Sequence, residues 1–544
     1  MKIGDLSCRP EPIRLFLAVI LCCGASGATF ADEAFVDIRH FGAKPDGTTL
    51  CTEAIQRAID SAAARGGGTV RFPPGKWRSG TIVLRSDVTL SLEEGCTLLG
   101  SGDLKDYPRH QPKIRSCADQ YVNQSLILGE DLDRVAIRGR GCIDGNGKAF
   151  PGDDWPNRPF VIRLINCRDV LVEDVTLHNS AMWMQLYSVC DRVTVRGVTL
   201  FNHQKHHADG INIDGCHDVI ISDCRFDCDD DGICLKSMSS RACENVTINN
   251  CHISSHCNAI KMGTHSLGGF KSIIISNCCI VSPRFSKVML GRQRGTSGIS
   301  LEIVDGGDMD RITISNIVMR GVSVPLFIRL GDKGRVVEPG TPKPPVGTLR
   351  NVICSNIVAT EMSPIGCAIT GLPGHLVEDV TLSNLHFSFE GGVQEARNQH
   401  PIPELPATYP ECIMFGTLPA YGLWCRHVKG LRLINVRLRA ASPDLRPAVV
   451  CDDVHDLDIG GLDVRISPGA ESGVRLIDVN RAIIRGCQPD GSASAFLGVE
   501  GKASDRIALM GNDLRGVRRT HVQGEEVGDT AVRAIGNLMV PPNQ

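Results

Sequence analysis

Short runs of aliphatic and β-branched residues, each preceded by a polar turn, recur along the chain. Five runs begin at Val170, Val193, Val219, Val246 and Ile273, so their starts are 23, 26, 27 and 27 residues apart. Later runs occupy residues 312–314, 352–354, 380–382, 431–433, 457–459, 482–484 and 507–509. Self-similarity at this period is typical of a solenoid, in which each repeat packs against its neighbours.

The repeats indicate an all-β parallel β-helix. A turn of about 25 residues holds no helix-length periodic segment, and the Leu/Asn consensus of leucine-rich repeats is absent. Short strands joined by Asn, Asp and Gly turns are the simplest solution. One amphipathic helix is predicted over residues 52–62, before the glycines at 66–68. We expect this helix to cap the N-terminal end of the solenoid.

We expect one solenoid domain over residues 32–544. The period breaks at residues 334–347, which are rich in Pro and Gly, and at residues 391–410. Both stretches are too short for domains. The sequence therefore predicts two loops that project from the solenoid and could wall a cleft.

Residues 1–31 have the layout of a secretory signal peptide. A cationic start is followed by an apolar run at residues 15–23 and by small residues up to Ala31, where we expect cleavage; Ala28 is a second candidate. The apolar run is too short to span a bilayer stably, although a retained anchor remains an alternative. We expect a secreted or periplasmic protein that has no membrane span after signal removal.

Composition narrows the possible partners. Hydrophobic residues make up 42% of the chain but aromatic residues only 5%, so a core of small aliphatic side chains is predicted. The formal net charge is −3 and no Lys/Arg block stands out, which argues against a nucleic-acid partner. We expect a monomer that needs no cofactor.

The 24 cysteines follow the repeat. Those at 142, 167, 190, 216 and 243 are 25, 23, 26 and 27 residues apart, and an odd number, 21, remains beyond residue 31. We interpret them as a buried column of mostly free thiols. Disulfides, for example near Cys228 and Cys234, are the alternative. Metal ligation is not expected, since no CxxC pair has a matching partner.

Three carboxylates recur at the interval of the repeat. Asp230 and Asp231 follow Asp209 by 21 and 22 residues, and neighbouring coils of a parallel sheet lie ~4.8 Å apart. Repulsion and partial burial raise at least one pKa in such a cluster, which places a proton donor beside ionised partners. Glycoside hydrolysis uses that combination, one acid to protonate the leaving oxygen and one base to activate water.

Other interpretations of these carboxylates stay open. Asp before Gly is common in turns, so each residue taken singly fits a turn, and clustered carboxylates also bind calcium. The joint spacing favours the acid/base cluster. Because Asp230 and Asp231 would point to opposite faces of a regular strand, we expect a turn or bulge there.

Two segments resemble the leading signatures of the polygalacturonase-like glycoside hydrolases, family 28. They are residues 207–213, His-Ala-Asp-Gly-Ile-Asn-Ile, and residues 230–237, Asp-Asp-Gly-Ile-Cys-Leu-Lys-Ser. The resemblance covers about residues 35–330. It implies a right-handed parallel β-helix and an inverting enzyme that cleaves uronic-acid-containing, pectin-type polysaccharide without a metal. It also implies that Asp230 is the general acid and that Asp209 and Asp231 hold the attacking water.

Two further signatures of the family differ in this chain. The family's Gly-His-Gly turn falls on Cys257, Asn258 and Ala259, so His256 is our candidate for the missing histidine. The family's Arg-x-Lys pair, which grips a substrate carboxylate, falls on Ser300 and Glu302. These changes suggest a different sugar or an exo mode of action.

An enzyme that binds uronates needs cations in place of that pair. Nearby candidates are Lys236, Lys261, Arg284, Arg292 and Arg294. Other expected substrate contacts are Asn258, Trp183 one coil before Asp209, and Tyr409 and Arg426 in a segment that combines aromatic rings with charge.

Two rival functions remain at this point. A polysaccharide lyase on the same fold would need calcium and a basic residue to abstract a proton. The second rival is a non-catalytic carbohydrate-binding surface protein, in which the altered signatures would reflect the loss of catalytic residues.

Overall fold

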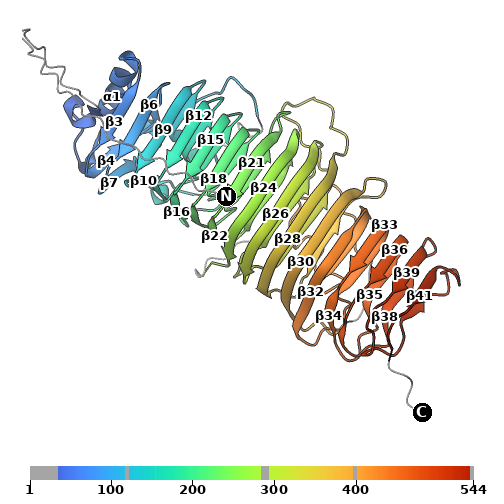
Figure 1. The fold of residues 1–544 in the computed structure, drawn as a ribbon. Helices are drawn as coiled ribbons and strands as arrows, with labels where there is room; N and C mark the ends of the chain where they lie inside the picture. The colour runs from blue at the N-terminus through green and yellow to red at the C-terminus, as the bar shows by residue number, and fades with distance from the viewer. Residues whose placement is uncertain (1–34, 117–121, 153–154, 284–292, 396–400, 540–544) are drawn as a thin grey trace, which may run out of the picture. The chain divides into compact units, whose positions relative to one another are not determined.

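Strands of successive coils stack in parallel and form three ladders. Figure 1 shows the strands of successive coils lying side by side along the solenoid. The computed structural model describes residues 35–116, 122–152, 155–283, 293–395 and 401–539. The predicted signal peptide, Arg284 and Arg292 therefore lie outside the described residues. The coils wind as a right-handed parallel β-helix, so the predicted fold class is confirmed.

The first ladder carries the candidate site. Its members are β5 (Ile82–Val83), β8 (Ser125–Glu130), β11 (Phe160–Ile165), β14 (Gln185–Ser188), β17 (Ile211–Asp214), β20 (Ile233–Ser237), β23 (Asn258–Ser266), β25 (Ser297–Ile303), β27 (Val324–Leu330), β29 (Cys367–Thr370), β31 (Leu423–Lys429), β33 (Val449–Gly460), β35 (Ser472–Ile477), β38 (Ala495–Glu500) and β40 (His521–Gln523).

The second ladder contains the aliphatic runs found in the sequence, and β33 extends into it from the first ladder and pairs with both β32 and β36. Its members are β1 (Val36–Asp37), β3 (Gly68–Phe72), β6 (Val88–Leu92), β9 (Asp133–Gly139), β12 (Arg168–Glu173), β15 (Asp191–Arg196), β18 (His217–Ser222), β21 (Cys243–Asn249), β24 (Gly269–Val281), β26 (Asp308–Arg320), β28 (Thr348–Met362), β30 (Val377–Gly391), β32 (Arg432–Ser442), β36 (Asn480–Arg485), β39 (Asp505–Met510) and β41 (Val532–Ile535).

The third ladder consists of short strands, and the long strands β24, β26, β28, β30 and β32 of the second ladder extend into it. Its own members are β2 (Asp46–Leu50), β4 (Gly75–Ser79), β7 (Cys96–Gly100), β10 (Cys142–Asp144), β13 (Thr176–His178), β16 (Thr199–Asn202), β19 (Arg225–Cys228), β22 (His252–Ser255), β34 (Asp463–Ile466) and β37 (Asp490–Gly491).

The observed register matches the predicted repeat. Val170, Val193, Val219, Val246 and Ile273 are partners in consecutive strand pairs. All five side chains are buried, because alternate residues of a strand point into the solenoid.

Bends at the corners of the coils, which in this part of the solenoid lie within the long strands, explain the recurring Asn and Asp residues. Asn277, Asn316, Asn356 and Asn384 have φ between 52° and 57°, a left-handed conformation that Asn tolerates well. Each side-chain amide donates to the Asn of the preceding coil, with N···O distances of 2.9–3.1 Å. This row of Asn–Asn hydrogen bonds fixes how the corners of successive coils align.

The cysteines line the same interior. The 20 cysteines among the described residues are all free, including Cys228 and Cys234. The backbone N–H of Cys190 points at the sulfur of Cys216 on the next coil, 3.3 Å away. The preferred interpretation as a column of free thiols is confirmed for this part of the chain.

The one α-helix of the described residues, α1 (Thr52–Ala64), lies where the sequence predicts a helix and buries Ile55 and Ile59. It contacts β1, β3, β5 and β6, and its capping role stays a prediction. No helix in the described part of the chain is long and apolar enough to cross a membrane.

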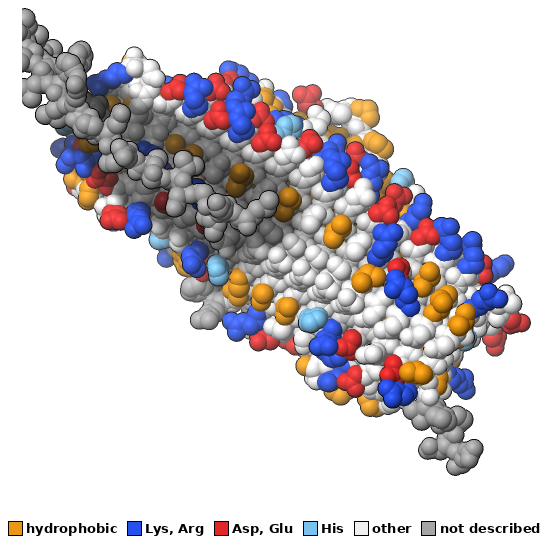
Figure 2. Space-filling model, viewed as in Figure 1, with side chains coloured by type: hydrophobic (Ala, Val, Ile, Leu, Met, Phe, Trp, Pro, Cys, Tyr) orange, Lys and Arg blue, Asp and Glu red, His pale blue; other side chains and the backbone are white. Residues whose placement is uncertain are grey.

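Both predicted loops occur between strands of the first and second ladders. The described residues of 331–347 and 392–422 contain no strand. Figure 2 shows the face that the second ladder dominates, where acidic and basic side chains are interspersed along the edges and exposed apolar side chains lie singly.

Candidate active site

The register of the first ladder brings the three predicted carboxylates together. Ile211 of β17 is the partner of Ile233 of β20, and the backbone N–H of Gly210 donates to the carbonyl of Asp231 at 2.9 Å. Asp209 and Asp231 therefore occupy equivalent positions on neighbouring coils. The segment before β20 is a turn rather than regular strand, which allows Asp230 and Asp231 to share one neighbourhood.

Carboxylate oxygens of Asp209 and Asp231 lie within 4.8 Å of each other and of the sulfur of Cys234. Oxygens of Asp230 and Asp231 likewise lie within 4.8 Å of each other. Asp209 and Asp231 are only 2% and 5% exposed, whereas Asp230 is half-buried. Asp230 is thus the most accessible of the three.

Two buried lysines balance this charge. The Nζ of Lys236 lies 3.6 Å from Oδ2 of Asp209, and the Nζ of Lys261 lies 3.6 Å from Oδ2 of Asp231. Lys236 also lies over the Trp183 ring, 4.8 Å from its centre. Two ammonium groups therefore stand where a bound calcium ion would otherwise have to balance the carboxylates.

The surroundings separate the proton affinities of the three acids. Burial and the charges of Asp209 and Asp231 raise the pKa of Asp230 well above its usual range. Burial raises the pKa of Asp209 to about 6, against the attraction of Lys236. Burial also disfavours ionised Asp231, but Lys261, Lys236 and hydrogen bonds from Asn258 outweigh it and lower its pKa. One proton donor and one firmly ionised partner result.

Asn258 directly supports Asp231. Its side-chain amide donates to Oδ1 of Asp231 at 2.8 Å, and its backbone N–H donates to the same oxygen at 3.2 Å. Ser297, on the next coil, donates to the side-chain oxygen of Asn258. The predicted substrate contact Asn258 is therefore a fully buried support for an acid.

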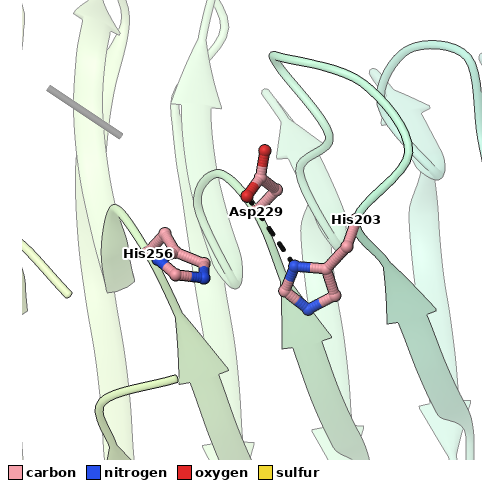
Figure 3. Close-up of side chains that lie close together, drawn as sticks. All are labelled: His203, Asp229 and His256. Carbon is pink, nitrogen blue, oxygen red and sulfur yellow. Dashed lines mark ion pairs between the residues drawn. The ribbon is translucent and has the colours of Figure 1, made fainter. Parts of the chain in front are cut away.

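His256 forms a group with His203 and Asp229, in which ring nitrogens and a carboxylate oxygen lie within 4.8 Å of one another, and its catalytic role stays a prediction. Figure 3 shows its ring turned toward His203 and Asp229. The His203 and His256 ring centres are 5.7 Å apart, and the side chains of Asp229 and His256 are both fully buried. The turn that carries Asp230 sends the side chain of the preceding Asp229 to this separate group, which sequence spacing could not show.

The segment 401–418, called loop 401–418 below, reaches back to the cluster from beyond β30. Its Glu411 accepts a hydrogen bond from Lys261 at 3.2 Å and lies 3.5 Å from the amide nitrogen of Asn258. Tyr409, 47% exposed, lies over Lys261 with 5.3 Å between the ring centre and Nζ. Glu411 lies between Tyr409 and Arg426, in the segment that the sequence marks by its aromatic rings and charges, but nothing in its spacing links it to Lys261.

Ser300 and Glu302 face the same lysine. Oε2 of Glu302 lies 3.9 Å from Nζ of Lys261, and Ser300 donates to Oε1 of Glu302 at 2.6 Å. Burial raises the pKa of Glu302 to about 8, against the attraction of Lys261. Lys261 is thus shared by Asp231, Glu302 and Glu411, and it is only 1% exposed.

Other predicted contacts lie elsewhere. Arg426 pairs with Glu404 at 2.6 Å and Asp452 at 3.1 Å, so it ties down loop 401–418. Arg294 pairs with Glu390 at 2.6 Å. Trp183 packs in an apolar group with Phe160 and is 5% exposed. Trp183 lies next to the carboxylate cluster, because Lys236 packs over its ring. Arg426 contacts loop 401–418 and Asp452 instead.

Sequence reasoning missed a second group of cations around His265. Arg335 is bound by Asp305, with 2.7 Å for the closest N···O pair, and also lies 3.3 Å from Nε2 of His265. Lys333 lies 5.9 Å from the centre of the Tyr409 ring. Burial and the nearby charges of Arg335, Lys236, Lys261 and Lys333 lower the pKa of His265 well below its usual range. The two new cations, Lys333 and Arg335, flank the predicted loop border at residue 334, a position with no periodic signal.

Comparisons with known proteins identify the family of this chain. The family model described as glycosyl hydrolases family 28 matches residues 80–403. A probable polygalacturonase of Vitis vinifera is 32% identical over 234 residues, which is 40% of this chain and 45% of that protein. An exo-poly-alpha-D-galacturonosidase of Dickeya chrysanthemi is 28% identical over 257 residues, 38% of this chain and 42% of that protein.

A solved structure of a hyperthermoactive exopolygalacturonase from Thermotoga maritima aligns with a TM-score of 0.55 at 21% identity. The alignment covers 66% of this chain and 87% of that one. At this identity the likeness shows the fold alone. The chain spans less than half the length of the two curated relatives.

Proposed function

Because this chain belongs to glycosyl hydrolases family 28, we propose that it is a glycosidase that hydrolyses a uronic-acid-containing, pectin-type polysaccharide. The observation that carries the proposal is the carboxylate cluster on two neighbouring coils, with the pKa of Asp230 raised and that of Asp231 lowered.

In the proposed mechanism Asp230 gives its proton to the glycosidic oxygen as the bond to the anomeric carbon breaks. A water molecule held by Asp209 and Asp231 attacks that carbon from the opposite face and gives its proton to one of these carboxylates. The configuration inverts, and the two products carry the transferred proton and the hydroxyl. Lys236 and Lys261 keep the base carboxylates ionised.

Asp230→Asn tests the assignment. We expect kcat to fall by about 10³-fold or more on pectic oligosaccharides, since a general acid and its electrostatic contribution are both lost. Asp218→Asn, at an exposed position of β18, is the matched control and should keep wild-type activity. Activity that survives in Asp230→Asn would remove Asp230 from the acid role.

The same assay separates the rivals. A lyase would release an unsaturated product that absorbs in the ultraviolet and would lose activity with chelator. A hydrolase releases new reducing ends without that absorbance. A non-catalytic binder would release nothing in either form.

We also propose an exo mode of action. Loop 401–418 covers the coils that follow the cluster: Arg329 donates to the carbonyl of Glu404 at 2.6 Å, and Phe415 packs edge to face on Trp424 with ring centres 5.1 Å apart. A polysaccharide chain that continued in this direction would meet the loop. We expect short products released from one end of a labelled oligosaccharide and no ladder of internal fragments.

Export is proposed from residues 1–31. The expected test is N-terminal sequencing of protein recovered outside the cytoplasm, which should begin just after Ala31. An uncleaved N-terminus there would contradict the signal-peptide interpretation.

A further inference from the structure

The cation nearest to the proposed base is already neutralised. Lys261 lies 3.2 Å from Glu411, 3.6 Å from Asp231 and 3.9 Å from Glu302. These three acids come from loop 401–418, from the turn before β20 and from β25. Lys261 is only 1% exposed, so its ammonium group interacts with acids of the protein itself.

The other lysine of the cluster is committed as well. Lys236 lies 3.6 Å from Asp209 and over the ring of Trp183, and it is 6% exposed. A sugar carboxylate that paired with Lys261 would lie close to Asp231 and Glu411, which already contact its Nζ. Charges of like sign a few ångströms apart repel strongly where water is excluded.

The same groups suit a sugar that carries hydroxyls only. Glu411 and Asp231 offer carboxylate oxygens that accept hydrogen bonds from hydroxyl groups. The Tyr409 ring is about half exposed and offers a flat apolar surface for a sugar face. A sugar needs no charge to bind to Glu411, Asp231 and Tyr409 in this way.

We propose that the sugar bound against Glu411 and Tyr409, next to the cleaved bond, is a neutral sugar, and that Glu411 is the residue that discriminates against a uronate there. This inference rests on the proposed function and specifies its substrate. The uronic acids of the polysaccharide would then lie on the other side of the cleaved bond.

Two cations that lie near His265, Lys333 and Arg335, define the competing outcome. Arg335 is held by Asp305, but Lys333 lies 5.9 Å from the Tyr409 ring centre and could meet a carboxylate that passed the ring. A uronate recognised in that way would depend on Lys333 and not on Glu411.

The test uses pairs of oligosaccharides that differ only in one terminal sugar, a hexose or the corresponding hexuronate, at each end in turn. We expect wild-type kcat/KM to be at least about tenfold higher for the hexose-ended member at one of the two ends. Glu411→Gln should shrink that ratio severalfold by improving the uronate-ended substrate. Glu390→Gln, which removes a carboxylate paired with Arg294, is the matched control and should leave the ratio unchanged.

The outcomes are distinct. Faster cleavage of the uronate-ended member by wild type, lost in Lys333→Met, would overturn the inference while leaving the glycosidase function intact. An unchanged ratio in Glu411→Gln would overturn the role of Glu411. Cleavage of no oligosaccharide at all would overturn the proposed function and this inference with it.

Discussion

Asn258 donates its side-chain hydrogen bond to Asp231 on the preceding coil, with 2.8 Å between Nδ2 and Oδ1. The bond crosses from the start of β23 to the turn before β20, so one coil of the solenoid orients an acid of the previous one. Because Asn258 is fully buried, this oxygen of Asp231 has a fixed direction.

Removing that bond should slow catalysis without unfolding the protein. A hydrogen bond to a charged group contributes about 1.5–3 kcal/mol, so we expect Asn258→Ala to lower kcat by about 10- to 100-fold. Steady-state kinetics measure the effect. Asn245→Ala, at an exposed position of β21 in the second ladder, is the control, and equal losses in both variants would contradict the role of Asn258.

The rate should fall on the acid side as Asp209 takes up a proton. Its pKa is raised to about 6 by burial, against the attraction of Lys236. The ionised form that holds water is therefore lost as pH falls through about 6. Lys236→Met removes the attraction, and the acid limb of the kcat/KM profile should move to higher pH. A limb that stays in place would show that Asp209 does not control it.

Glu302 should make the protein less stable as pH rises. Its pKa is about 8 in the folded protein and near 4.5 when unfolded, because burial disfavours its charge. The neutral form is favoured by folding, so stability is full below about pH 4.5 and declines until about pH 8. Glu302→Gln should remove that decline and stabilise the protein above pH 8 by a few kcal/mol, as measured by urea unfolding at several pH values. An unchanged pH dependence would count against this account.

Loosening loop 401–418 should change the product pattern. Phe415 packs on Trp424 and lies 5.4 Å from the guanidinium of Arg329. We expect Phe415→Ala to free the loop and to increase internal cleavage of long substrates. Phe387→Ala, on β30, removes a buried ring from the core without touching this loop and is the matched control. Internal fragments that appear equally in both variants would point to general destabilisation.

Reducing agents should have no effect on folding. The described cysteines are free and mostly buried, and they act as small apolar side chains. We expect the thermal midpoint to change by less than about 1 °C with dithiothreitol, since no disulfide loop closure among them contributes to stability. A drop of several degrees would indicate a bond that involves the cysteines outside the described residues.

The sequence by itself determined the solenoid and the carboxylate cluster. Period and alternation are local properties, and in a parallel ladder an interval of one coil places Asp209 beside Asp231. The recurring Asn and Asp residues marked the turns for the same reason, because a left-handed backbone favours them at each corner.

Only the tertiary structure decided what surrounds that cluster. Glu411 is 150 residues from Lys261 along the chain, and the return of loop 401–418 follows no repeat. The adjacent residues Asp229 and Asp230 belong to different side-chain groups. Both lie in the bend before β20, and the residue pattern does not fix the dihedral angles of that bend. Spacing along a strand predicts neighbours within the ladder, whereas the direction of a turn and the path of an inserted loop depend on packing against the completed fold.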